Sequence, residues 1–338
     1  MAAFDPNGVG VKGTLFGLPY DSENADIIVI PMPWDATVSY NSGTIDGPAA
    51  ILEASSQIDY EIPGITAPWK TKVAMLEIPG MWHTKGIQLR MKAQAYIDWL
   101  EKGSPEEEKE DMLARRDEVN KQCAQLMTYV RQESEYWQNK GKKTILLGGD
   151  HSTPLGHMQA ITEKHGEIGI LQIDAHADLR KAYEGFTYSH ASIMHNVMDK
   201  CAISRLVQVG VRDYCEEEFE RIEASGLKMK TFFDQHLKED QFGGITWQEQ
   251  CDEIIEVLPE KVYLSLDIDG LRPEFCPSTG TPVPGGMDTD QLFYLLKKLK
   301  GSGKEVVGAD LVEVAPGHSE WDANVGARVL WRIVQLLN

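Results

Sequence analysis

The sequence has few cysteines, and none of them stands at a spacing that would give it a structural role. The five cysteines are scattered and form no C-x-x-C pair: Cys123, Cys201, Cys215, Cys251 and Cys276. An odd, dispersed set argues against a disulfide framework and against a structural zinc site. We therefore expect a reducing compartment, the cytoplasm.

Basic residues and long apolar runs are also scarce. Lys and Arg number 33 against 52 Asp and Glu, giving a formal net charge of −19. Nucleic acids and anionic membranes attract clustered Lys and Arg, so neither is expected as a partner. The longest apolar runs, such as Ile27–Ile30 and Thr144–Leu147, have the length of strands and are too short to span a membrane. Residues Met1–Gly10 lack a basic segment followed by an apolar one, so we expect no secretory signal.

What the sequence does contain is an alternation of strand and helix patterns. Short apolar, β-branched runs predict strands at Asp26–Pro31, Lys72–Ile78, Lys143–Leu147, Ile168–Ile173, Arg205–Val209, Lys228–Phe233, Val262–Leu266 and Val306–Leu311. Helical spacing recurs at Pro154–Lys164, Ser189–Met198, Cys215–Ala224, Thr246–Val257, Asp288–Leu299 and Asp322–Leu337. Repeated strand–helix units predict an α/β protein with three α/β/α layers around a central, mostly parallel sheet.

No sequence feature divides the chain into parts. It has no internal repeat, low-complexity tract or Gly/Ser-rich linker, and the candidate site residues fall on both sides of its midpoint. We expect a single domain over residues 1–338, with an N-terminal extension at 1–24. Residues Asp98–Trp137 form a charged, helix-prone insertion with an acidic run at Glu106–Asp111. We expect a solvated loop leading into a surface helix there; the alternative is an oligomer-contact or lid insertion.

Carboxylates and histidines stand where three of the expected strands end. They follow the strands at 143–147, 168–173 and 262–266, and they are His151, Asp174, His176, Asp178, Asp267 and Asp269. The carboxyl ends of parallel strands meet at one crevice, where ligands bind. Side chains two apart on an extended segment point the same way, so Asp174, His176 and Asp178 form one row. Asp267 and Asp269 form another.

Such a set of charged groups needs a partner if it is buried. Crowded carboxylates repel one another, and buried charges must be neutralised by partner groups or by metal. Carboxylates with a few imidazoles suit Mn²⁺ or a similar ion, and two ions about 3.5–4 Å apart form a hydrolytic site. A lone Asp at a strand end is more often a turn residue or helix cap, and we expect that role of Asp150.

The strand-end motifs resemble those of a known family. Gly148–Ser152, Asp174–Asp178 and Ser265–Gly270 are similar, in order and spacing, to the three signature motifs of the ureohydrolase (arginase/agmatinase) family. Further similar segments are Pro33–Pro48, Gly280–Gly286 and Asp310–Pro316, so the resemblance covers roughly residues 25–338. It implies an α/β/α fold and hydrolysis of a guanidino C–N bond with release of urea. It also implies two Mn²⁺ ions, with Ni²⁺ as the alternative, and a homotrimer or homohexamer.

The resemblance also implies roles for individual residues. It assigns one metal to His151, Asp174, Asp178 and Asp267, and the other to Asp174, His176, Asp267 and Asp269. Asp178 would be the immediate proton carrier, His190 a shuttle of protons to solvent, and Glu313 the group that holds the guanidinium. Without the resemblance, His190 would be a residue at a helix N-terminus. Glu313, inside an apolar run, would pair with an Arg such as Arg212 or Arg328.

The substrate within the family stays open. The segment Asp174–Arg180 is more similar to agmatinases than to arginases, which carry asparagine where Arg180 stands. An agmatine-like cationic guanidinoalkane is the first candidate. A small guanidine compound is the second, since the segment Trp69–Gly86 and the charged insertion would narrow the pocket. A guanidino or formimino acid, its carboxylate held by Arg180, is the third.

Two readings come from other classes. A zinc deacetylase shares an Asp-x-His strand end, but it needs one metal and leaves His151, Asp178 and Asp269 unexplained. A non-catalytic partner subunit would be expected to lose metal ligands, and none is missing. A count of bound metal ions separates both from the binuclear hydrolase.

Overall fold

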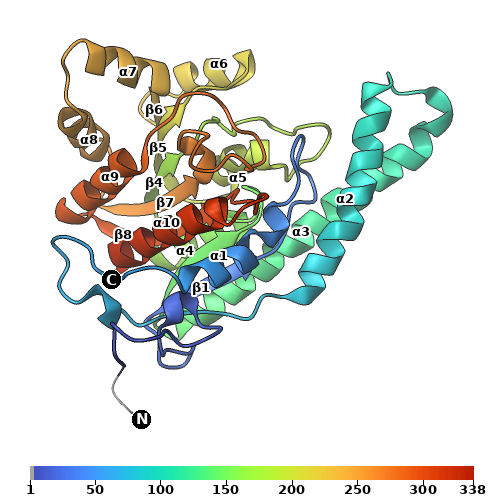
Figure 1. Ribbon diagram of the computed structural model, residues 1–338. Coiled ribbons are helices and arrows are strands. Elements are labelled where there is room, and N and C mark those ends of the chain that lie inside the picture. Colours follow the sequence, from blue (N-terminus) through green and yellow to red (C-terminus); the bar gives the residue numbers. More distant parts are fainter. Residues whose placement is uncertain (1–3) are drawn as a thin grey trace.

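The computed structural model describes residues 4–338, and one eight-stranded sheet forms its centre (Figure 1). The strands are β1 (Ile27–Met32), β2 (Val73–Met75), β3 (Lys143–Gly148), β4 (Ile168–Ile173), β5 (Ile203–Val211), β6 (Met229–Phe233), β7 (Lys261–Asp267) and β8 (Glu305–Val312). Their order is β2-β1-β3-β8-β7-β4-β5-β6, and every neighbouring pair is parallel. All eight expected strands are present, and the sheet is parallel throughout.

The most apolar strands are those that are buried on both faces of the sheet. Every residue of β1 and of β4 is buried, because helices cover both faces of a parallel sheet. The edge strand β2 is shorter than the expected run Lys72–Ile78. The chain leaves the sheet there before Pro79, which precedes the next helix and has no N–H for a ladder bond.

Two groups of helices cover the two faces, and each group buries its own apolar cluster. The first contains α1 (Gly47–Ser55), α7 (Asp234–Phe242), α8 (Trp247–Glu256), α9 (Thr289–Gly301) and α10 (Trp321–Leu337). The second contains α2 (Gly80–Glu101), α3 (Lys109–Asn139), α4 (Leu155–His165), α5 (Ile193–Lys200) and α6 (Glu216–Ala224). The expected three-layer α/β/α fold is confirmed. Among residues 4–338, no helix has both the length and the apolar composition needed to cross a membrane.

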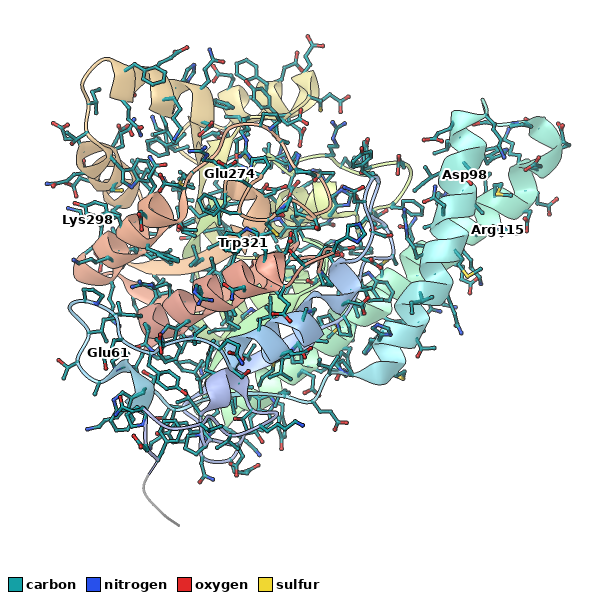
Figure 2. All side chains as sticks on the ribbon, in the orientation of Figure 1. Glu61, Asp98, Arg115, Glu274, Lys298 and Trp321 are labelled. Carbon is teal, nitrogen blue, oxygen red and sulfur yellow. The ribbon has the colours of Figure 1, made fainter. Side chains whose placement is uncertain are left out.

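The charged insertion contains the expected helix, but it begins inside the preceding helix and not in a loop. Its first residues, from Asp98, belong to the last turn of α2, and its acidic run begins in a short 3-10 turn, η4 (Glu106–Glu108). Helices α2 and α3 form a hairpin that extends beyond the sheet, with Asp98 and Arg115 towards its outer end (Figures 1 and 2). One face of α3 is buried along much of its length, including Val119 and Leu126. The hairpin is therefore packed structure along its inner part.

Candidate metal centre

The candidate site lies where four adjacent central strands end. The order β3-β8-β7-β4 puts their carboxyl ends side by side, which is where ligands bind in open parallel sheets. The ends of these strands and the segments that follow them carry His151, Glu313, the pair Asp267 and Asp269, and the run Asp174–Asp178. The structure thus brings together all six candidate ligands from three segments of the chain. Asp150 is a turn residue, as expected, and accepts the N–H of Ser152 at 3.0 Å.

Three carboxylates converge on one imidazole nitrogen. The Nδ1 atom of His151 lies 3.0 Å from Asp174 Oδ2, 3.0 Å from Asp178 Oδ2 and 3.3 Å from Asp267 Oδ2. None of these contacts has the direction of a hydrogen bond, and within the described residues this buried Nδ1 has no hydrogen-bond partner. The other ring nitrogen, Nε2, lies 3.0 Å from the hydroxyl of Ser265. Nδ1 is therefore the nitrogen turned towards the carboxylates.

A second group of candidate ligands lies beside the first and shares Asp174 with it. His176 Nδ1 lies 3.1 Å from Asp269 Oδ2 and 3.5 Å from Asp174 Oδ1. One carboxylate oxygen of Asp174 thus faces each histidine. The two compact groups are His151, Asp174 and Asp267, and Asp174, His176 and Asp269. Asp267 belongs to the first group only, although the family resemblance assigns it to both metals.

The geometry and the burial of these groups fit divalent cations. Two ligands at right angles on an ion, each bonded at about 2.1 Å, lie about 3 Å apart, which is the spacing around His151 Nδ1. Burial raises the pKa of Asp267 well above its usual value, and neighbouring Asp269 and Asp174 add to the rise. Burial, helped by Asp174, raises the pKa of Asp178 to about 7. Carboxylates in this place are costly without a cation, and oxygen donors with imidazoles suit Mn²⁺ or a similar ion.

Two residues of the site adopt a backbone conformation that side chains rarely take. Asp178 has φ 56° and Glu313 has φ 62°, in the left-handed region where non-glycine residues are uncommon and often functional. Backbone hydrogen bonds hold both: the carbonyl of Asp178 accepts the N–H of His195 at 3.2 Å, and the N–H of Glu313 donates to the carbonyl of Gly149 at 2.8 Å. The strand β8 has ended by Glu313, so strand alternation does not set the direction of its side chain.

Glu313 is buried without an ion-pair partner among residues 4–338. Its Oε1 atom accepts the backbone N–H of His151 at 2.8 Å, and its Oε2 atom has no hydrogen-bond partner within the described chain. The alternative pairing with Arg212 or Arg328 is wrong. Arg212 donates to backbone carbonyls, including that of Asp269 at 2.8 Å, and Arg328 donates to Asn324.

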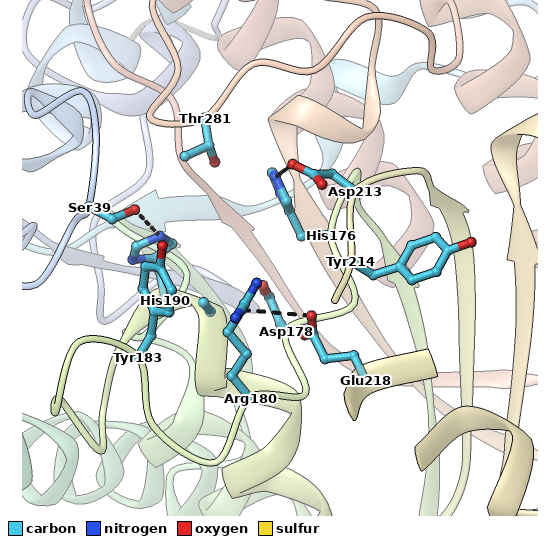
Figure 3. A pocket seen from close by; sticks show the side chains of 11 residues that line it. Ser39, His176, Asp178, Arg180, Tyr183, His190, Asp213, Tyr214, Glu218 and Thr281 are labelled. Atoms are coloured by element: carbon cyan, nitrogen blue, oxygen red, sulfur yellow. Dashed lines mark hydrogen bonds and ion pairs between the residues drawn. The ribbon is translucent and has the colours of Figure 1, made fainter. Parts of the chain in front are cut away.

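A small polar cavity of about 130 Å³ opens beside His176 and Asp178 (Figure 3). Its other lining residues are Ser39, Arg180, Tyr183, His190, Ala191, Asp213, Tyr214, Glu218 and Thr281. His190 begins the 3-10 turn η5 (His190–Ser192), and its Nε2 lies 3.4 Å from the hydroxyl of Ser39. Burial lowers the pKa of His190 to about 3, so its imidazole is neutral near pH 7.

Three lining residues were not anticipated from the sequence. Asp213 follows the end of β5, so the rule that pointed to the other strand ends also applies to it. Glu218 lies in the first turn of α6 and accepts the N–H of Cys215 at 3.0 Å, which gives it the signature of a helix cap. Tyr214 has no distinguishing sequence signal. Arg180 lies between Glu218 and Tyr183, with its Nε 3.7 Å from Glu218 Oε2 and its guanidinium carbon 4.8 Å from the centre of the Tyr183 ring.

Comparison with known sequences points to one family. A sequence model of the Arginase family matches residues 25–335. The chain is 33% identical over 308 residues to N(1)-aminopropylagmatine ureohydrolase of Thermus thermophilus, covering 90% of this chain and 88% of the relative. It is 28% identical to an agmatinase of Bacillus anthracis, covering 89% of this chain and 87% of that protein.

Solved structures agree on the fold. The agmatine ureohydrolase of Thermoplasma volcanium has a TM-score of 0.71 at 22% identity, covering 96% of this chain and 94% of that one. Proclavaminate amidino hydrolase from Streptomyces clavuligerus has a TM-score of 0.70 at 23% identity, covering 96% of each chain. The sequence match spans nearly the whole chain and includes every strand end that carries a candidate ligand. The chain therefore belongs to the arginase family.

Proposed function

We propose that this protein is a binuclear-metal ureohydrolase that hydrolyses a guanidino C–N bond and releases urea. The observation that carries the proposal is the pair of buried His–carboxylate groups that share Asp174 and border a small polar cavity. Family membership supports it, as do the relatives that are named ureohydrolase and agmatinase. The match to the arginase family also weighs against a zinc deacetylase.

The ligands of the two ions are proposed as follows. One ion is held by His151, Asp174, Asp178 and Asp267, and the other by Asp174, His176, Asp267 and Asp269. The crowding of oxygens around His151 Nδ1 and the shared position of Asp174 support this assignment. Mn²⁺ is the proposed metal and Ni²⁺ the alternative. When bound, two such ions supply Lewis acidity and generate a nucleophile from water at neutral pH.

The chain's own residues would bind the substrate and move protons. Glu313 Oε2, buried without a partner among the described residues, would accept N–H groups of the guanidinium in a charge-assisted bond. Asp178 would accept the proton released by the attacking water and return it to the leaving nitrogen. His190 would carry protons between the site and solvent. A proton carrier needs a pKa near the working pH. Burial holds the pKa of His190 at about 3. The role therefore requires that water reach the imidazole and raise its pKa.

An agmatine-like guanidinoalkane is the first proposed substrate, in keeping with the names of the relatives. The small cavity of about 130 Å³ favours a short guanidino compound as the second candidate. A guanidino acid is less favoured, because Arg180 is already paired with Glu218 and lies over the ring of Tyr183. Its charge is therefore partly neutralised before any carboxylate arrives.

A urea assay on the Mn²⁺- or Ni²⁺-loaded protein tests the proposal. The panel is agmatine, guanidine, guanidinobutyrate, guanidinopropionate, arginine and formiminoglutamate, the last scored by formamide. We expect urea from agmatine or guanidine at rates well above those of the acids. No turnover of any compound with Mn²⁺, Ni²⁺ or Co²⁺ would instead support a non-catalytic partner subunit.

We further propose that residues 1–338 act as a single domain in the cytoplasm and form a homotrimer or homohexamer. The five cysteines, all within the described residues, are free, which suits a reducing compartment. The oligomer follows from the resemblance to the family alone. Light scattering of the purified protein gives the number of chains per particle.

A further inference from the structure

The α2–α3 hairpin lies against both loops that border the cavity. We call residues 34–45 the substrate-side loop and residues 179–190 the histidine loop. The substrate-side loop contributes Ser39 to the cavity wall, and the histidine loop contributes Arg180, Tyr183 and His190. The hairpin itself contributes no lining residue to this cavity. Because the hairpin lies against both loops, it can nevertheless fix the positions of the residues that line the cavity.

The tip of the histidine loop fits between the two helices of the hairpin. Residues 183–186 form a tight turn in which Tyr183 and Phe186 exchange both backbone hydrogen bonds, at 3.2 and 2.8 Å. A Cβ placed on Gly185 would lie 2.8 Å from Cδ of Arg116 on α3 and 2.9 Å from the hydroxyl of Tyr96 on α2. The buried ring of Phe186 meets the ring of Tyr96 edge-on, 5.6 Å between centroids. The turn is thus enclosed by the hairpin at van der Waals distance.

Asn120 of α3 forms two hydrogen bonds with the backbone at this turn. The side-chain amide of Asn120 donates to the carbonyl of Gly185 at 3.0 Å, and its carbonyl oxygen accepts the N–H of Thr187 at 2.9 Å. Asn196 of α5 donates to the carbonyl of Thr187 at 2.8 Å. The chain is therefore fixed three residues before His190, because both backbone groups of Thr187 are held.

Helix α2 holds the substrate-side loop in a similar way. Arg90 donates to the carbonyl of Val38, next to Ser39 in the chain. Gly86 brings the helix close to the loop, since a Cβ there would lie 2.9 Å from Cδ1 of Ile45. The two loops then meet at the cavity, where the hydroxyl of Ser39 lies 3.4 Å from Nε2 of His190. Figure 3 shows this contact as a dashed line.

We propose that the α2–α3 hairpin acts as a clamp, meaning that its contacts fix the positions of the substrate-side loop and the histidine loop. Within this clamp, Asn120 is a positioning residue that holds His190 at the cavity. The clamp gives the charged insertion a function within its own subunit. The effect on catalysis rests on the proposed role of His190 in proton transfer, whereas the effect on the loop does not. The two parts can be tested separately.

The first test compares Asn120→Ala with Asn139→Ala in the metal-loaded protein. Asn139 is an exposed residue at the other end of the same helix, so it is a matched control. We expect Asn120→Ala to speed amide hydrogen exchange in residues 181–190 with metal content unchanged, and Asn139→Ala to leave exchange as in the wild type. Equal exchange in all three proteins would overturn the clamp. If Asn120→Ala does not fold, Asn120→Asp serves in its place, because it keeps the acceptor for Thr187 and loses the donor to Gly185.

The second test is a double-mutant cycle with His190→Ala, read in kcat. Asn120→Ala alone should lower kcat by about 10- to 100-fold, since a displacement of about 1 Å at a working group can cost about 100-fold. If Asn120 acts through His190, the double variant loses no more than His190→Ala alone. Effects that multiply would show that Asn120 does not act by positioning His190. A normal kcat in His190→Ala, with loosened exchange in Asn120→Ala, would contradict the proton role proposed for His190 and leave the clamp supported.

Discussion

The carboxylate of Glu313 is tied to the backbone of His151: Oε1 accepts the N–H of His151 at 2.8 Å. One short bond thus fixes the proposed substrate-binding group relative to a candidate metal ligand 162 residues earlier in the chain. The second oxygen, Oε2, is buried and has no partner within residues 4–338. A buried acceptor left without a partner costs free energy, which a bound guanidinium would recover.

Replacing Glu313 with Gln should therefore impair substrate binding in the transition state. The variant keeps the size of the side chain and an acceptor for His151, but it loses the charge. We expect kcat/KM to fall by about 100-fold or more, which corresponds to roughly 3 kcal/mol. Metal content and the thermal midpoint should stay close to the wild type. An unfolded variant, or a kcat/KM near the wild-type value, would make Glu313 a structural residue.

Metal content tests the ligand assignment directly. The purified, metal-loaded protein should hold two divalent ions per chain by elemental analysis, and Asp267→Ala should lose at least one ion together with urea production. Asp26→Ala is the control, because Asp26 is an exposed carboxylate just before the start of β1, at the opposite end of the strands from both compact ligand groups. It should keep both ions. One zinc per chain in the wild type, with no response to Mn²⁺ or Ni²⁺, contradicts the binuclear site.

The strand ends were predictable from the sequence because a parallel sheet gathers them at one edge. Asp174 follows an apolar strand and Asp267 ends one, so their proximity needs only the strand order and not the details of packing. The direction of Glu313 was not predictable in the same way. The φ of 62° at Glu313 turns the chain at the end of β8, and no glycine in the sequence signals this turn.

The contacts between the α2–α3 hairpin and the site could not be predicted from the sequence, for a different reason. Its contacts with the site depend on pairs far apart in the chain, such as Asn120 with Gly185, 65 residues later. The buried residues of α2 are mixed with polar and charged ones, so the helical period of this segment is weak. An asparagine on a charged helix reads as a surface residue until the histidine loop is placed against it.

At Gly149 the backbone after β3 passes very close to the backbone of Trp34. A Cβ on Gly149 would lie 1.9 Å from the carbonyl oxygen of Trp34, and the N–H of Asp150 donates to that same oxygen at 2.8 Å. Gly149→Ala must push the segment after β3 away from Trp34, so we expect a loss of unfolding free energy of about 3 kcal/mol or more. Gly141→Ala, at a position with open space but a positive φ of 78°, should cost only about 1 kcal/mol. Urea denaturation measures both, and equal costs would contradict the close approach.

His157 provides a test of buried electrostatics away from the proposed metals. It lies on α4, fully buried, with Nδ1 2.7 Å from the hydroxyl of Tyr263 and Nε2 2.8 Å from the hydroxyl of Thr144. Burial lowers the pKa of His157 to about 3. An unfolded histidine titrates near pH 6.5, at about its ordinary value. Between these two values the unfolded chain binds a proton that the folded chain does not.

The stabilisation from a neutral His157 is consequently complete above about pH 6.5 and is lost as the pH falls towards 3, by about 1.4 kcal/mol per pH unit. His157→Gln removes the titration and keeps an amide that can pair with the two hydroxyls. We expect the difference in unfolding free energy between variant and wild type to shift by about 2 kcal/mol in favour of the variant from pH 7.5 to pH 5. His318→Gln, a replacement at an exposed position, controls for the loss of an imidazole as such. A difference that does not change with pH would mean that folded His157 titrates at the same pH as in the unfolded chain, despite its burial.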